Sequence, residues 1–223
     1  MAKVYLSPSD QESNVYAYDN TNEAVQCGRI AEACRAALER SGVEVKVGHM
    51  ISMAQKCSES NAFGADLHVP IHTNAFNGKV MGTRMFCYSA GGKGMAACKA
   101  IFARLAPITP GESENIQVNA DYYEVRVPAA PTAYIECEFH DTVEGAKWIV
   151  ENTVLIGETI ARGICDYFGV KFVEKPKPVE PEKKDVLYRV QIGAYKIKAN
   201  AEKRQAEAKA AGFTDAFIVT VEQ

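Results

Sequence analysis

The stretch from Ala65 to Gly78, ADLHVPIHTNAFNG, contains a buried strand and carries two of the four histidines of the chain. Residues 65–71 are apolar enough for a strand inside a sheet, and polar residues suited to a loop follow them. Open α/β sheets place their sites at the carboxyl ends of such strands. His72 stands at that end, so it is the first candidate for a metal ligand.

His68 and His72 lie at positions i and i+4 of this predicted strand. They share a face, but at about 3.3 Å per residue they are roughly 13 Å apart. Zinc ligands lie about 2 Å from the ion, so the two imidazoles cannot bind the same ion. We therefore expect His68 to be packed or hydrogen-bonded beneath the site, and His72 to be the candidate ligand.

Strands and helices alternate on both sides of this stretch. Strands are predicted at residues 3–6, 43–47, 65–71, 81–88, 124–127 and 133–139, and helices at 22–40, 51–63, 94–105 and 144–168. Alternation of this kind is typical of an α/β protein. We expect a single twisted, mostly parallel sheet with helices on both faces.

The composition excludes several classes of protein. The chain has 223 residues, is 47% hydrophobic and carries a net charge of −3, so it has no basic surface suited to nucleic acid. It contains no apolar run of the roughly 18 residues that a membrane helix needs. The seven cysteines are scattered without CxxC spacing, as expected for buried thiols in a reducing compartment. The first residues do not resemble a secretory signal, so we expect synthesis in the cytoplasm and action elsewhere only after release or lysis.

The composition changes near residue 173. The stretch VEKPKPVEPEKKD, residues 173–185, is rich in Pro, Lys and Glu and predicts a semi-extended linker. Residues 186–223 then have the pattern of a strand, a helix and a strand. We expect a first domain at 1–172, a linker at 173–185 and a small β-α-β module at 186–223.

Glu23 opens the first long predicted helix. Counting on from it along the buried stripe gives Cys27, Ile30 and Cys34, so its carboxylate extends a face that is aimed at the core. A carboxylate in a first turn also interacts favourably with the helix dipole, wherever it points. Its place on the buried stripe favours a functional role.

The stretch PTAYIECEFHD, residues 131–141, supplies a second set of polar candidates. Tyr134, Glu136, Glu138 and His140 alternate, and therefore share one face of the predicted strand. Carboxylates at the end of a buried strand are costly to desolvate unless they are paired or bind a metal. The alternatives are a general base with neighbours that tune it, or an edge strand with a solvated face.

Together these stretches resemble the zinc-dependent N-acetylmuramoyl-L-alanine amidases (the amidase-3 family), in particular the branch of endolysins and cell-wall hydrolases of Gram-positive bacteria and their phages. NEAVQCGRIAEAC resembles the family's helix that begins with a zinc-binding Glu, which implies this role for Glu23. DLHVPIHTNAFNG resembles the strand end whose His binds zinc, here His72. AYIECEFHD resembles the closing strand with its catalytic base, here Glu136.

One departure from the family concerns the third zinc ligand. Members of the family carry a zinc-binding His after the first strand, where this chain reads LSPSDQESN and has none. Asp10 or Gln11 could supply an oxygen ligand, or His140 could reach in from the closing strand. We take His140 as the third ligand or a direct neighbour, and Asn74, Glu138 and Gln11 as residues that bind substrate or support the site.

The resemblance implies hydrolysis of the amide bond between N-acetylmuramic acid and L-alanine in peptidoglycan, with one zinc ion. The alternatives are a peptidoglycan-binding protein that has lost its metal, and a peptidase acting on short peptides. The stretch YRVQIGAYKIKANAEKRQAEAKAAGF, residues 188–213, resembles the first half of a SPOR domain, which implies binding to glycan strands. Peptidoglycan is thus the expected partner, without nucleic acid or membrane.

Overall fold

The computed structural model describes residues 1–176 and 188–221. The chain divides after Pro176 into two units, each described by itself. Most of the predicted linker lies outside the described residues. Its first residues lie against the first unit, where Val173 N donates to Ser41 Oγ at 3.0 Å and Glu174 pairs with Arg162 at 2.6 Å.

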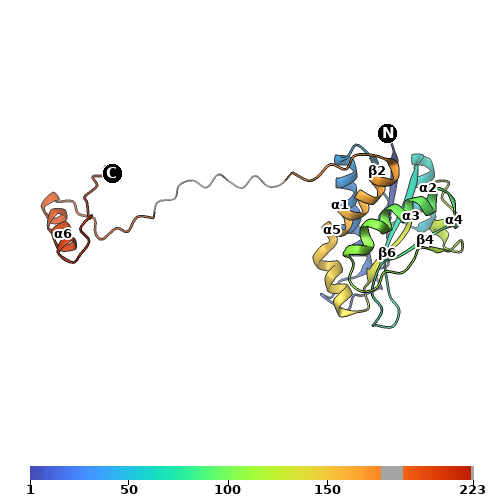
Figure 1. Ribbon diagram of the computed structural model, residues 1–223, viewed down its shortest axis with the longest axis horizontal. Coiled ribbons are helices and arrows are strands. Elements are labelled where there is room, and N and C mark those ends of the chain that lie inside the picture. Colours follow the sequence, from blue (N-terminus) through green and yellow to red (C-terminus); the bar gives the residue numbers. More distant parts are fainter. Residues whose placement is uncertain (177–187, 222–223) are drawn as a thin grey trace. The chain divides into compact units, whose positions relative to one another are not determined.

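The first unit is built on a six-stranded sheet with the order β2-β1-β3-β6-β4-β5 (Figure 1). Neighbouring strands are parallel except β4 and β6, which run antiparallel. The strands are β1 (Lys3–Pro8), β2 (Glu44–Val47), β3 (Leu67–Asn74), β4 (Arg84–Cys87), β5 (Gln117–Val118) and β6 (Tyr134–Phe139). The prediction of a single, mostly parallel sheet is confirmed.

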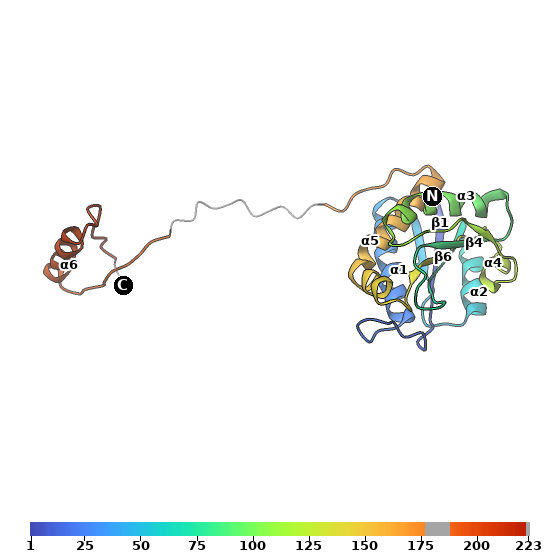
Figure 2. The ribbon, with the colours of Figure 1, turned by 60° about the horizontal axis from the view of Figure 1, so that its bottom comes forward.

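Helices cover both faces of this sheet, as Figure 2 shows with α1 and α5 on one side and α2 and α4 on the other. In the first unit they are α1 (Glu23–Arg40), α2 (Met53–Phe63), α3 (Gly92–Leu105), α4 (Tyr123–Arg126) and α5 (Val143–Phe168), with a 3-10 turn, η1, at Ala106–Ile108. The helices α1 and α3 both pack against the long α5. The longer helices α1, α3 and α5 therefore cover one face of the sheet, and the shorter α2 and α4 cover the other.

The main core lies between the sheet and α1, α3 and α5. From α1, the predicted stripe of Cys27, Ile30 and Cys34 is fully buried there. The strands contribute the apolar residues that alternate along them, such as Val69 and Ile71 of β3. The other residues of the same strands face α2 and α4, and several of them are polar.

Two predictions along the chain were wrong. Residues 124–127 were expected as a strand, but 124–126 belong to the single helical turn α4 and Val127 is its C-cap, and the short β5 was not foreseen. In the second unit the predicted helix is present as α6 (Lys198–Ala210), whereas residues 188–221 contain no strand. None of the helices in the described ranges is long and apolar enough to cross a membrane.

Candidate active site

The candidate site lies towards the carboxyl end of β3, beside the middle of β6. His72 and Glu136 are register partners on these adjacent strands. Glu23 is the first residue of α1, whose N-cap Asn22 accepts a hydrogen bond from Val25 N. The loop between β1 and α1 thus brings the start of the helix to the edge of the sheet where β3 ends.

Glu23 and His72 are in direct contact. His72 Nδ1 donates to Glu23 Oε1 at 2.9 Å, and Thr73 N donates to the same oxygen at 3.3 Å. Glu23 is 1% exposed and His72 is 7% exposed. Burial raises the pKa of Glu23, but the hydrogen bond and charge of His72 outweigh it and hold that pKa below its usual value.

The loop after β1 surrounds this pair with amides. Asn14 Nδ2 donates to Glu23 Oε2 at 2.6 Å and to Gln11 Oε1 at 3.0 Å. Gln11 Nε2 lies 3.5 Å from His72 Nδ1. Gln11 therefore stands beside His72 and is linked to Glu23 through Asn14, in the loop where the sequence resemblance leads us to expect a further histidine.

Glu136 lies next to this pair, but neither Glu23 nor His72 makes a hydrogen bond to its Oε2 atom. Its Oε2 is buried and has no hydrogen-bond partner, and His72 Nε2 is in the same condition. Burial raises the pKa of Glu136 to about 8; the charge of His72 lowers it in part, and the charge of Glu23 raises it further. Conversely, burial lowers the pKa of His72, but the Glu23 hydrogen bond and the charges of Glu136 and Glu23 raise it above its usual value.

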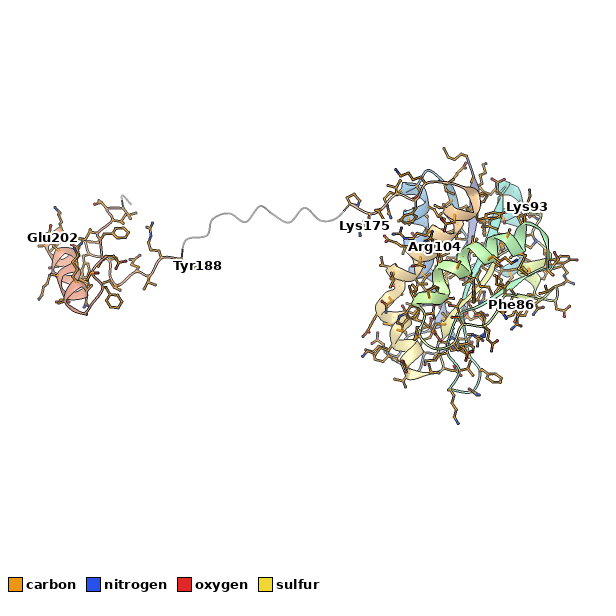
Figure 3. All side chains as sticks on the ribbon, viewed as in Figure 1. Phe86, Lys93, Arg104, Lys175, Tyr188 and Glu202 are labelled. Atoms are coloured by element: carbon orange, nitrogen blue, oxygen red, sulfur yellow. The ribbon has the colours of Figure 1, made fainter. Side chains whose placement is uncertain are left out.

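Aromatic rings pack against the imidazole of His72. The ring of Tyr134 stacks on His72 with centroids 4.7 Å apart. Tyr122 and Phe86 pack in turn against Tyr134, at 5.1 Å and 6.0 Å (Phe86 is labelled in Figure 3). The imidazole is therefore fixed by stacking on one side and by Glu23 at its Nδ1 atom.

The predicted third ligand, His140, belongs to a separate network. Its Nδ1 atom lies 2.9 Å from the Thr73 hydroxyl, which also bonds the Tyr16 hydroxyl at 2.8 Å. Its ring stacks on Tyr16 with centroids 5.0 Å apart. The structure does not bring His140 into a group of three close metal-binding side chains with Glu23 and His72.

The physical reason is a break in the strand pairing. The register of β3 and β6 shifts between His72 and Asn74, and His140 lies one residue beyond the end of β6. Simple alternation from Glu136 therefore fails at this point. His140 as a ligand has no geometric support in this structure and remains a sequence-based prediction.

Two of the predicted supporting residues have structural partners of their own. Glu138 accepts hydrogen bonds from Gly82 N at 2.8 Å and 3.0 Å, and Gly82 has a φ of +114° that only glycine adopts without strain. Asn74 Oδ1 accepts from Ala75 N at 2.8 Å. Both side chains shape the loops that border the site.

Asp10, the other oxygen ligand considered, is already occupied. Its carboxylate pairs with Lys56 Nζ at 2.7 Å and accepts from Met50 N at 2.7 Å. These contacts hold the start of the loop after β1 against α2. Of the alternatives for a third ligand, Gln11 is the one that lies beside His72.

A second polar cluster on the same sheet face was not foreseen from the sequence. His68 is fully buried, as expected, and its Nε2 lies 3.2 Å from Glu124 Oε1 of α4. Cys57 of α2 completes a group whose potential ligand atoms all lie within 4.8 Å of one another. The wrong assignment of residues 124–127 to a strand concealed it, because only the helical turn brings Glu124 to His68.

The comparisons with known proteins identify the family of the first unit. Residues 9–166 match the N-acetylmuramoyl-L-alanine amidase family, Amidase_3, over more than half of the chain. The chain belongs to this family. Its members are hydrolases of the amide bond between N-acetylmuramic acid and L-alanine in peptidoglycan. Residues 171–222 match the SPOR domain family.

Individual amidases are similar to this chain over most of its length. The sporulation-specific N-acetylmuramoyl-L-alanine amidase of Bacillus subtilis is 26% identical over 98% of this chain and 85% of its own length. The catalytic domain of CwlV from Bacillus (Paenibacillus) polymyxa matches with a TM-score of 0.70 at 17% identity, over 77% of this chain and 100% of that one. AmiC2 of Nostoc punctiforme matches with a TM-score of 0.66 at 18% identity, over 75% and 97%. These two structures show the amidase fold of the first unit.

Proposed function

We propose that this amidase hydrolyses peptidoglycan at Glu23, His72 and Glu136, with one zinc ion held by Glu23 and His72. The observation that carries the proposal is the convergence of these three side chains at the end of β3. They come from three separate elements and are all at least nine-tenths buried, yet one atom each of His72 and Glu136 has no partner. Buried side-chain atoms without hydrogen-bond partners are expected where an ion and a substrate bind.

The donor atoms of the site fit a zinc ion. Zinc accepts imidazole nitrogen and carboxylate oxygen at about 2.0–2.2 Å, so two such ligands of a tetrahedral site lie about 3.3 Å apart. Glu23 Oε1 and His72 Nδ1 are 2.9 Å apart with a proton between them. If Glu23 Oε1 and His72 Nδ1 move slightly apart, an ion fits between them in place of that proton.

We propose Gln11 as the third protein ligand. Its amide nitrogen is 3.5 Å from His72 Nδ1, and a half-turn of the amide group presents its oxygen at the same place. That half-turn breaks the hydrogen bond from Asn14 Nδ2 to Gln11 Oε1, whereas the bond from Asn14 to Glu23 Oε2 remains. An amide oxygen is a weaker zinc ligand than imidazole, so we expect weaker zinc retention than in a site with two histidines.

When bound, zinc would polarise the scissile carbonyl, make a bound water more acidic and lower the pKa of Glu136 through its charge. Glu136 accepts the proton of the attacking water and then donates it to the nitrogen of the departing L-alanine. Tyr134 holds the His72 ring in place during this exchange. The pKa of about 8 belongs to the metal-free site, and the charge of zinc would lower it towards the range in which Glu136 can both take and return a proton near neutral pH.

The absence of a first-strand histidine favours a second candidate function, a wall-binding protein without metal. The SPOR match supports binding to peptidoglycan in either case. Joining a binding module to an amidase raises the local concentration of the enzyme at its substrate. We further propose that the protein acts on the wall after release from the cytoplasm or lysis of the cell.

The test is hydrolysis of purified Gram-positive cell walls by the full chain loaded with zinc. We expect free amino groups to appear without new reducing sugar, and Glu136→Gln to lower the rate by about 10²–10⁴-fold. Ile135→Val, on the opposite face of the same strand, is the matched control and should keep the rate. An unchanged rate in Glu136→Gln would refute the assignment, and no hydrolysis together with no bound zinc would favour the wall-binding function.

A further inference from the structure

We propose that Cys57, His68 and Glu124 form a second metal site, structural and separate from the active site, for zinc or a similar borderline ion. The three residues come from α2, β3 and α4. In the described part of the chain they are the one group of three or more Cys, His, Asp or Glu side chains close enough to share an ion. The site lies beneath the active site on the same face of the sheet.

Geometry and burial support a closed site. The potential ligand atoms lie within 4.8 Å of one another, and tetrahedral zinc with sulfur, nitrogen and oxygen ligands needs separations of about 3.3–3.6 Å. Cys57, His68 and Glu124 are 1%, 0% and 3% exposed. Structural zinc sites are of this kind, enclosed by protein and supported by residues that orient the ligands.

The supporting residues are already present around the cluster. The Ser7 hydroxyl donates to Glu124 Oε1, and the ring of Tyr5 stacks on His68 with centroids 5.4 Å apart. These contacts fix the orientation of the carboxylate and of the imidazole before an ion binds. Ser7 Oγ lies beside the cluster as a candidate fourth ligand.

Charge balance also favours a dication. A thiolate, a carboxylate and a neutral imidazole carry two negative charges, which a divalent ion neutralises. Lys56 Nζ pairs with Asp10 at 2.7 Å and donates to the carbonyl of Pro8, so its hydrogen bonds go to these groups, although its charge also acts on Cys57 and Glu124. Metal binding would release the thiol proton to water.

One buried nitrogen of the cluster has no hydrogen-bond partner. His68 Nε2 faces Glu124, whereas His68 Nδ1 is buried and makes no hydrogen bond. Hydrogen bonding to Glu124 therefore does not satisfy the buried imidazole, and the ring keeps capacity to bind an ion.

The elements that the ion would join need such a link. The helix α4 has four residues, too few for a stable isolated helix, and α2 buries only Lys56, Cys57 and Ser60. A metal ion bound to both of them and to β3 would hold this thin layer against the sheet. It would thereby also hold Tyr122, next to α4, against Tyr134.

The test is cobalt substitution of the full chain, because a thiolate ligand gives cobalt(II) a near-ultraviolet charge-transfer band that nitrogen and oxygen ligands do not give. We expect the band in the wild-type protein and in His72→Ala, and its loss in Cys57→Ser. Cys98→Ser is the matched control, since Cys98 is a buried thiol on α3 whose sulfur bonds the carbonyl of Phe86, and it should keep the band. Persistence of the band in Cys57→Ser would refute the site.

A measurement on the wild-type protein covers the case in which Cys57→Ser does not fold. Zinc-edge X-ray absorption of the zinc-loaded chain should show a sulfur neighbour at about 2.3 Å and about two zinc ions per chain. One zinc ion with nitrogen and oxygen neighbours only would overturn the proposal while leaving the active site intact. Glu124→Gln should lower the zinc content from about two to about one ion per chain.

Discussion

The two faces of the central sheet are formed by the same strands but differ in almost every physical respect. On one face, Val69, Ile71 and Ile135 pack into a continuous core under α1, α3 and α5. On the other, His68, His72 and Glu136 lie under two shorter helices, with buried polar atoms that lack partners. Because alternate residues of one strand point to opposite faces, β3 and β6 each serve stability and chemistry at once.

This difference shows where the fold can hold costly groups. Burying a polar group without a partner destabilises a protein by about 1–3 kcal/mol, so the polar face weakens the fold that the apolar face stabilises. Single substitutions on the two faces of the same strand should therefore have different effects. Those on the polar face should lower activity, and those on the apolar face should lower stability. The predictions below use such pairs.

The largest effect is expected from His72→Ala on the polar face of β3. Even residues that merely support a metal ligand change affinity or activity by about 10–100-fold, so loss of the ligand should lower activity by more than about 100-fold. Zinc content and wall hydrolysis measure this. Ile71→Val, its neighbour on the apolar face, should keep both; full activity in His72→Ala would show that the chemistry lies elsewhere.

Ile135→Ala should lower the stability of the protein and leave its activity nearly unchanged. This residue is fully buried in the main core, and truncation of a buried isoleucine costs about 2–5 kcal/mol of unfolding free energy. Denaturant unfolding measures the loss, and the rate per folded molecule should change little. A normal stability combined with a large loss of rate would contradict the division between the faces.

Glu136 should make the metal-free protein less stable as the pH rises. Its folded pKa is about 8, whereas 4.5 is the usual value, so between these pH values the unfolded chain has lost a proton that the folded chain keeps. Stability therefore falls with rising pH, by up to about 1.4 kcal/mol per pH unit. Glu136→Gln removes this contribution and should be more stable than the wild type at pH 8 in chelator, but not at pH 4; equal slopes in both proteins would refute it.

The smallest effect is expected at Gln11. If its amide is the third ligand, Gln11→Ala should weaken zinc binding by about tenfold, and Gln11→His should strengthen it. Competition with a chromogenic chelator measures both. His140→Ala is the comparison, since its side chain bonds Thr73 and stacks on Tyr16; a larger loss of zinc in His140→Ala than in Gln11→Ala would restore His140 as the ligand.

The sequence predicted the apolar face more completely than the polar one. The stripe through Cys27, Ile30 and Cys34 has helical spacing, and local periodicity suffices to identify it. His72 was recognisable because it stands near the end of a buried strand, and Glu136 because polar residues alternate along another. Their placement as register partners agrees with that expectation.

Other features depend on contacts between distant residues, which periodicity does not contain. Glu124 meets Ser7 and His68 only because residues 123–126 form a helical turn in place of the predicted strand. His140 turns towards Thr73 because the register of β3 and β6 shifts near their ends. Neither the turn nor the shift can be read from a local pattern of apolar residues.

The most direct test of the central claim, that the carboxyl end of β3 holds the catalytic metal, is anomalous diffraction at the zinc edge from crystals of the zinc-loaded chain. We predict a peak about 2 Å from both Glu23 Oε1 and His72 Nδ1, with the carboxylate of Glu136 beside it. A fully loaded crystal with no anomalous peak near Glu23 and His72 would contradict the account.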